Sequence, residues 1–112
     1  MEVKRPSNTP AILVVSADVI AGKEEEFNKW YDEHHIPLYS SKMPHVKSIR
    51  RFYSKRSSPS FITIYEYASM DDLKKSLGSR EAKGTGDDAD KQIGVTARSF
   101  SYHSYAQIYS QW

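Results

Sequence analysis

Apolar and polar positions alternate in four separate segments of the chain, which is the pattern of β-strands with a covered face. In the first segment both parities are largely apolar, so we expect both faces of that strand to be covered. The turn-forming loop Arg56-Ser-Ser-Pro-Ser60 separates the middle two segments and predicts a hairpin. The four predicted strands are Ala11–Ile20, Val46–Lys55, Phe61–Tyr67 and Ser99–Tyr109.

Helical periodicity replaces this alternation after the first strand. Four residues at positions i, i+3, i+4 and i+7 predict one face of an amphipathic helix, and they are Phe27, Trp30, Tyr31 and His34. Glu24–Glu26 place negative charge in the first turn, where the helix dipole favours it. Pro37 lacks the amide hydrogen that continuation requires, so we expect the helix to end there, with a less regular link over Leu38–His45.

A second, shorter helix is predicted over Met70–Leu77, with Ser69 as its N-cap. Residues 1–10 are polar and predict a loose N-terminal segment, whereas residues 78–98, with several glycines and clustered charge, predict a mobile loop. The chain is then one domain with the element order βαββαβ. This order predicts the α+β ferredoxin-like fold, in which two helices cover one face of a four-stranded antiparallel sheet.

Side-chain parity predicts what lies on the uncovered face of the sheet. On the third strand Ile62 and Ile64 are expected to face the helices, which leaves the opposite parity open, namely Phe61, Thr63, Tyr65 and Tyr67. On the last strand His103 shares a parity with Tyr105 and Tyr109. The second strand leaves its orientation open, because two apolar pairs of opposite parity compete, Val46 with Phe52 and Ile49 with Tyr53.

So many aromatic side chains on an open sheet would make a monomer prone to association. We therefore expect two sheets to pair face to face across a two-fold axis, forming a homodimer through the open face. The alternative is a small-molecule cleft on a monomer.

Composition excludes several classes of function. Within 112 residues the chain has 16 basic and 14 acidic residues, interspersed along the sequence, so nucleic acid is not the expected partner. Cysteine is absent, which excludes disulfides and thiolate chemistry. No apolar run approaches the roughly 18 residues that cross a membrane, and none follows the charged start as a signal peptide would. We expect a cytoplasmic protein without membrane contact.

A family resemblance rests on the helical segment from Phe27 to Pro37, which reads FNKWYDEHHIP. With the later segments Met43-Pro44, Ser48–Phe52 and Ile64–Tyr67, it resembles the EthD-like branch of the dimeric α+β barrel superfamily, loosely from Ala11 to Tyr109. The sequence departs from the family where Pro44-His45 stands in place of the usual Pro-Gly, which places an extra imidazole near the expected site.

The resemblance implies a ferredoxin-like homodimer with a cavity between sheet and helices. Related proteins include cofactor-independent monooxygenases, polyketide decarboxylases and cyclases, and haem-binding branches, so the fold alone does not name a reaction.

The paired histidines are the candidate acid/base groups, because imidazole titrates near neutrality. Helix geometry favours His34 as the inward group, whereas the family position favours His35, which could be oriented by Asp32 one turn earlier. Both alternatives stay open. A metal site is not expected, because adjacent helical histidines point about 100° apart and no HExxH spacing occurs.

The predicted function is that of an EthD-like enzyme using histidine acid/base chemistry, without a bound cofactor, on a hydrophobic oxygenated substrate of aromatic or polyketide-like type. The alternative is a noncatalytic ligand-binding or accessory homodimer. The residues expected to contact the small hydrophobic ligand are Trp30, Arg51, Tyr65, Tyr67 and His103.

Overall fold

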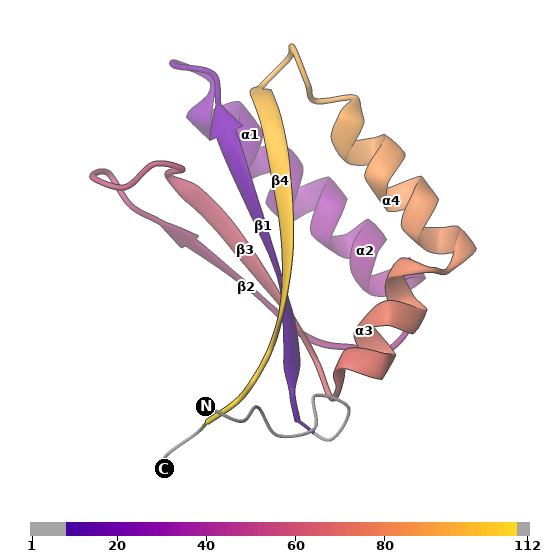
Figure 1. Cartoon of the computed structure of the whole chain (residues 1–112). Helices are drawn as coiled ribbons and strands as arrows, with labels where there is room; N and C mark the ends of the chain where they lie inside the picture. The colour runs from indigo at the N-terminus through magenta and orange to yellow at the C-terminus, as the bar shows by residue number, and fades with distance from the viewer. Residues whose placement is uncertain (1–8, 110–112) are drawn as a thin grey trace.

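The computed structural model describes residues 9–109 and contains one four-stranded sheet in the order β2-β3-β1-β4 (Figure 1). Every neighbouring pair of strands is antiparallel. The helices gather on one side of this sheet. This arrangement confirms the predicted ferredoxin-like fold. The strands are β1 (Ala11–Val19), β2 (Val46–Tyr53), β3 (Phe61–Tyr67) and β4 (Ala97–Ala106).

The first helical region crosses Pro37 instead of ending there, which corrects the prediction of an irregular link. It consists of α1 (Glu24–Trp30), the π-helical turn η2 (Tyr31–His35) and α2 (Ile36–Lys42). In η2 the amide of Ile36 donates to the carbonyl of Tyr31, five residues back. The widened turn lets α2 start afresh with Pro37 in its first turn, where a missing N–H costs little.

The second helical region corrects the prediction of a mobile loop over residues 78–98. After α3 (Met70–Leu77) the chain forms a further helix, α4 (Arg80–Asp90). The Ser79 hydroxyl caps α4 by accepting a hydrogen bond from the amide of Ala82 at 3.3 Å. Gly84 and Gly86 lower the intrinsic helix propensity, but burial of one face of α4 on the rest of the protein outweighs that cost.

The faces of β3 are the reverse of those predicted. Phe61, Thr63, Tyr65 and Tyr67 are buried under the helices, whereas the alternate residues Ile62, Ile64 and Glu66 are only partly buried. The register explains the reversal, because Tyr65 lies opposite the buried Leu13 and Ile64 lies opposite Val14 of the other face. The aromatic residues of β3 therefore build the core and the aliphatic ones form the open face.

A bulge resolves the two competing parities of β2. The register shifts between Val46 and Ser48, so that both Val46 and Ile49 lie opposite helix-facing tyrosines of β3. Phe52 pairs with Ile62 on the open face and is 47% exposed. Ile49 and Tyr53 therefore share the helix-facing side, whereas Val46 and Phe52 fall on opposite faces, because the inserted residue changes the parity within the strand.

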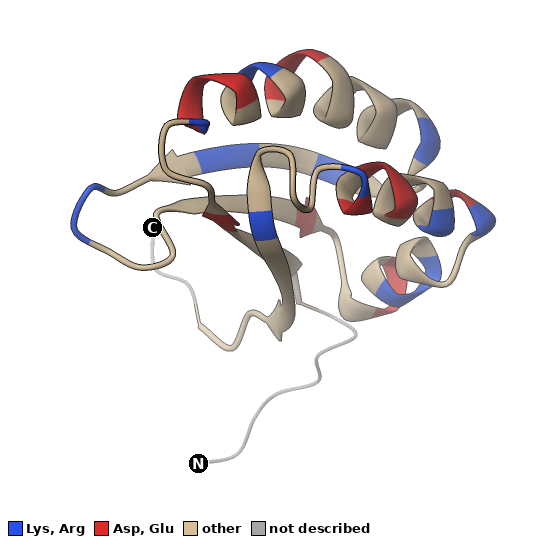
Figure 2. Cartoon of the chain, turned by 90° about the horizontal axis from the view of Figure 1, so that it is seen from above, with Lys and Arg blue, Asp and Glu red and all other residues tan. Residues whose placement is uncertain are grey.

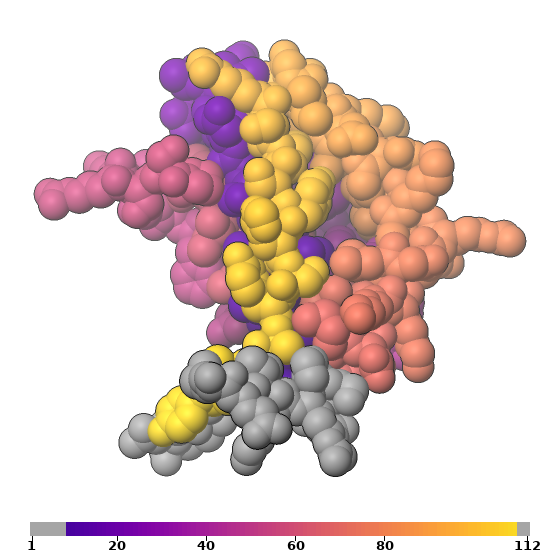
Figure 3. Space-filling model, viewed as in Figure 1, coloured from indigo at the N-terminus to yellow at the C-terminus, as the bar shows by residue number. Residues whose placement is uncertain are grey.

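Charged residues of both signs lie mainly on the helices and connections, whereas the sheet carries few (Figure 2). The edge strand β4 runs down one face of the molecule with its side chains largely exposed (Figure 3). None of the helices within residues 9–109 is long and apolar enough to cross a membrane.

Candidate functional site

A cavity of about 90 Å³ lies between the sheet, the first helical region and α4. Its walls are mostly apolar, with polar groups contributed by one histidine and several tyrosines. From the sheet come Leu13, Val15, Tyr65, Phe100 and Tyr102, and from the helices come Tyr31, His35, Tyr39, Met43, Leu77, Ala82, Thr85, Gly86 and Ala89. The cavity thus combines an apolar interior with a few hydrogen-bonding groups, as small-molecule sites usually do.

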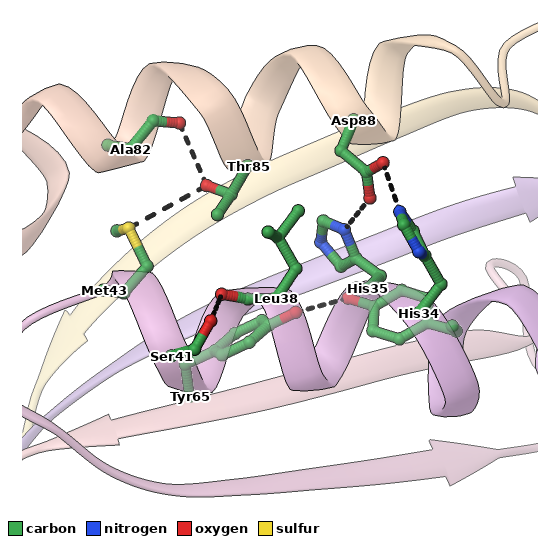
Figure 4. A network of polar contacts seen from close by, with 10 residues as sticks. His34, His35, Leu38, Ser41, Met43, Tyr65, Ala82, Thr85 and Asp88 are labelled. Atoms are coloured by element: carbon green, nitrogen blue, oxygen red, sulfur yellow. Dashed lines mark hydrogen bonds and ion pairs between the residues drawn. The ribbon is translucent and has the colours of Figure 1, made fainter.

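Asp88 of α4 binds both histidines of the first helical region (Figure 4). His35 Nδ1 lies 2.8 Å from Asp88 Oδ2, and His34 Nε2 lies 2.9 Å from Asp88 Oδ1. The side chains of His35 and Asp88 are 7% and 12% exposed, whereas that of His34 is 60% exposed. One carboxylate therefore joins a buried imidazole on the cavity wall to an imidazole at the surface.

The wide turn η2 explains why His35, and not His34, points inward. The buried residues of this region follow one another at intervals of four, namely Phe27, Tyr31, His35 and Tyr39. In a regular α-helix each such step overshoots a full turn by about 40°, so three steps would carry the last residue about 120° away from the first. The π-helical turn takes up part of this drift. Regular helical spacing therefore gave the wrong inward histidine, and the family position pointed to the buried one.

Burial lowers the pKa of His35, and the hydrogen bond and negative charge of Asp88 oppose that effect only in part. His35 is therefore mainly neutral at neutral pH. Burial alone would raise the pKa of Asp88, but the hydrogen bonds from His35 and His34 outweigh it, and the pKa of Asp88 is lowered. An ionised Asp88 accepts the Nδ1 hydrogen of His35 and leaves Nε2 as the basic nitrogen. Within residues 9–109 Nε2 has no hydrogen-bond partner.

A pair of hydrogen-bonded tyrosines lies near this histidine. The hydroxyl oxygens of Tyr31 and Tyr65 are 2.6 Å apart, and the ring of Tyr31 meets that of His35 edge-on at 5.1 Å. Burial raises the pKa of both hydroxyls, and for Tyr65 the neighbouring Tyr31 raises it further. Both groups therefore stay protonated and can donate hydrogen bonds at neutral pH.

The other predicted ligand contacts lie around the cavity rather than in its wall. The Trp30 ring stacks on the outer side of His35, with ring centroids 4.8 Å apart. Tyr67 lies deeper in the core, where its hydroxyl bonds those of Tyr39 and Ser76. Of the five predicted contacts, Tyr65 alone lines the cavity.

Arg51 and His103 are also outside the cavity wall. The Arg51 guanidinium binds Asp32 and Asn28 and lies 4.4 Å from the centroid of the Tyr31 ring, so it supports the site from behind. His103 pairs with Val14 on the exposed side of the sheet. Asp32 is thus engaged by Arg51 and is not the partner of His35 that the sequence analysis suggested.

The sequence analysis missed Asp88, because it assigned residues 78–98 to a loop. A signal was present: Ala82, Thr85, Gly86 and Ala89 fall at i, i+3, i+4 and i+7, the spacing of one helix face. All four line the cavity. The Thr85 hydroxyl also lies 3.8 Å from the Met43 sulfur, joining α4 to the end of α2.

Two further observations concern the predicted chemistry. Within residues 9–109 no group of three or more histidine or carboxylate side chains has an arrangement that could hold a metal ion. His45, the extra imidazole of the sequence analysis, is absent from the cavity wall.

Comparison with known proteins identifies the fold. No family model matches the chain, and neither does any curated protein. An EthD family protein from Bacillus halodurans C-125 has a similar structure, with a TM-score of 0.65, 13% identity and coverage of 88% of this chain and 98% of the other.

Two other solved structures are similar. SnoaB from Streptomyces nogalater, a cofactor-independent oxygenase, matches with a TM-score of 0.66 and 11% identity over 91% of this chain and 96% of its own. A dimeric protein of unknown function with a ferredoxin-like fold, from Bacteroides fragilis, matches with a TM-score of 0.58 and 15% identity over 88% and 96%. At such identities the likeness establishes a shared fold.

Proposed function

We propose that this protein is a small-molecule enzyme in which His35, oriented by Asp88, acts as the acid/base group on a hydrophobic oxygenated ligand in the cavity. The observation that carries the proposal is the 2.8 Å hydrogen bond between His35 Nδ1 and a largely buried carboxylate, at the wall of an apolar cavity. A buried carboxylate that fixes the tautomer of a histidine is a recurrent arrangement in general acid–base catalysis.

The first step is proton removal from the ligand. Asp88 holds the Nδ1 hydrogen of His35, so the lone pair on Nε2 accepts the proton. The lowered pKa keeps this nitrogen free of a proton at neutral pH. The proton would come from an acidic C–H or O–H group, such as a carbon next to a carbonyl or a phenol, and the imidazolium that forms is stabilised by Asp88.

The tyrosine pair supplies the complementary group. When the ligand loses a proton, negative charge develops on its oxygen, and a hydroxyl donor aimed at that oxygen lowers the barrier. Either hydroxyl can be the donor in the hydrogen bond between Tyr31 and Tyr65, so Tyr65 can accept from Tyr31 and donate its own hydrogen to a ligand. We assign this role to Tyr65, whose ring lines the cavity on the side of the sheet.

The volume of the cavity bears on the type of ligand. At about 90 Å³ it is smaller than the roughly 300–1,000 Å³ of typical drug-sized sites. This supports a ligand with a single aromatic ring rather than a multi-ring polyketide. The fold shared with a cofactor-independent oxygenase supports a reaction that needs no bound cofactor.

We further propose that the protein forms a homodimer through the open face of the sheet. This face carries aliphatic residues of β1 and β3 in its centre and the exposed rings of Phe52 and Tyr105 at either side. Covering such a surface with a second copy removes apolar area from water. The B. fragilis protein of similar fold is itself described as dimeric.

A noncatalytic ligand-binding dimer is the second candidate. It is favoured by the dense hydrogen bonding of the tyrosines to one another, because a hydroxyl engaged with a neighbouring hydroxyl is less available to a ligand. The two candidates differ in whether a bound ligand is turned over.

The experiment pairs ligand binding with turnover. Substituted phenols and cyclic 1,3-diketones would be screened by NMR for shifts of cavity resonances, and each binder would be assayed for conversion in air. We expect conversion by the wild type and a loss of about 10²–10⁴-fold in His35→Ala. His45→Ala, which removes an imidazole that is absent from the cavity wall, serves as the control and should stay active. Undiminished turnover in His35→Ala would refute the acid/base role, and binding without turnover would favour the second candidate.

A further inference from the structure

Asp88 is shared between two imidazoles that differ greatly in exposure. Its Oδ2 faces His35 at 2.8 Å and its Oδ1 faces His34 at 2.9 Å, so both oxygens of one carboxylate are engaged. An acid/base mechanism on His35 requires the first contact but gives no reason for the second. The second contact involves a side chain that is 60% exposed and does not reach the cavity.

We propose that His34 is a positioning residue that acts through Asp88 to orient the imidazole of His35. The inference rests on the proposed role of His35 as the acid/base group. His34 donates the hydrogen on Nε2 to Asp88 Oδ1, which fixes the rotation of the carboxylate about its last bond. Oδ2 is then held in line with His35 Nδ1, and the tautomer of His35 with Nε2 free is favoured.

The Asp88 carboxylate has few other hydrogen-bond partners that could fix its orientation. Within residues 9–109 Asp88 makes side-chain hydrogen bonds to the two histidines alone. Its neighbour Asp87 points to Lys83 on the opposite, exposed side of α4. Without His34 the carboxylate would be fixed by a single hydrogen bond and free to rotate about it.

The same contact connects the buried site to the charge of a surface group. Burial lowers the pKa of His35 most, Asp88 raises it, and the charge of His34 lowers it further. The titratable groups that face this cluster are Asp88 from α4 and His35 from η2, with the rings of Tyr31 and Tyr39 at 5.1 and 6.4 Å from His35. Through Asp88, an exposed side chain is thereby coupled to a histidine that the solvent barely reaches.

Imidazole NMR tests the inference without a substrate. Long-range ¹⁵N–¹H spectra would be recorded across a pH titration for the wild type, His34→Ala, His34→Gln and Glu33→Gln. In His34→Ala we expect the Nδ1 hydrogen of His35 to exchange with water about two- to fivefold faster, the factor that an exposed pair of this kind supplies.

His34→Gln keeps a donor for Asp88, so the exchange rate should stay as in the wild type. Glu33→Gln alters the neighbouring exposed residue and should leave the exchange rate unchanged. If the exchange rate and the titration of His35 in His34→Ala equal those of the wild type, His34 is a surface ion pair and nothing more.

The outcome is independent of the proposed function. Turnover that survives in His35→Ala would refute the catalytic role of His35, yet the spectra would still reveal whether His34 controls its orientation. Conversely, an unchanged spectrum in His34→Ala would overturn the positioning role while leaving His35 as the acid/base group.

Discussion

At the scale of single residues, His45 has a backbone conformation that is unfavourable for a residue with a side chain. Its φ angle is +72°, in the left-handed region that side chains with a Cβ rarely adopt. The residue stands at the end of the turn between α2 and β2, where the resembling family usually has glycine. The chain therefore adopts a conformation that favours glycine at a residue that carries a Cβ.

Replacing this residue should stabilise the protein. In His45→Gly we expect the free energy of unfolding to rise by about 1 kcal/mol. The left-handed conformation costs an L-residue roughly 1–2 kcal/mol, and the larger entropy that glycine gives the unfolded chain offsets part of the gain. Urea denaturation measures the change. His45→Ala is the control, since it removes the imidazole but keeps the Cβ. An equal gain in His45→Ala would show that the backbone is not the cause.

A second expectation at the scale of single residues concerns the stability of the protein at acidic pH. The pKa of His35 is lower in the folded protein than its ordinary value of about 6.5. The unfolded chain therefore binds the proton more readily, so the stability supplied by neutral His35 is present above about pH 6.5 and is lost as the pH falls. Asp88, whose pKa is also lowered, adds a loss of the same sign at lower pH, below its ordinary value of about 4.

We therefore expect the free energy of unfolding to decrease between pH 7 and pH 5 in the wild type. This slope should be smaller in His35→Gln, which has no titrating group there. A slope that is the same in both proteins would contradict the assignment of a buried neutral imidazole.

At the scale of elements, α4 combines poor helix propensity with a central place in the site. Gly84 and Gly86 both lie within α4, and a Cβ built at either position meets no atom within 4 Å. They differ in surroundings, because Gly86 lines the cavity and Gly84 is exposed. This makes them a matched pair for separating helix propensity from cavity shape.

Gly84→Ala and Gly86→Ala should each raise the free energy of unfolding by up to about 1 kcal/mol, the difference in helix propensity between the two residues. Only Gly86→Ala adds a methyl group to the cavity wall, so it alone should weaken the binding of a cavity ligand identified in the phenol screen. Thermal denaturation and NMR titration measure the two effects. Equal binding by both variants would show that the ligand does not approach α4.

The sequence predicts the elements of this fold better than their details. Strong alternation located all four strands, and turn residues located the hairpin at residues 56–60. The path through Pro37 was not predictable from periodicity, because the π-helical turn adds one residue to the regular helical spacing. That change decides which histidine is buried.

Two other errors have their own physical causes. The faces of β3 were reversed because isoleucine was preferred over tyrosine as a core residue, whereas the buried tyrosines satisfy their hydroxyls with one another, as Tyr65 does with Tyr31. Asp88 was missed because two glycines concealed α4. Both errors lie where tertiary contacts overrule local preference.

At the scale of the whole molecule, the open face of the sheet is the surface that we propose to bind a second copy. In the monomer Phe52 and Tyr105 are 47% and 53% exposed, and Ile62 and Ile64 between them are only partly covered. The helices leave this surface free, since they pack on the other side of the sheet. We therefore still expect a face-to-face dimer, although β3 presents aliphatic residues instead of tyrosines at the centre of the open face.

Light scattering with size-exclusion chromatography tests this expectation. At micromolar concentration the wild type should have twice the monomer mass of 12.9 kDa. Phe52→Glu should shift the protein to the monomer, because pairing would bury a charge without a partner at the interface, whereas its exposed position spares the fold. Val95→Glu introduces the same charge at an apolar residue that is 53% exposed in the connection between α4 and β4, and should stay dimeric. A wild-type protein that elutes as a monomer would refute pairing through the sheet, and a dimer unaffected by Phe52→Glu would place the interface elsewhere.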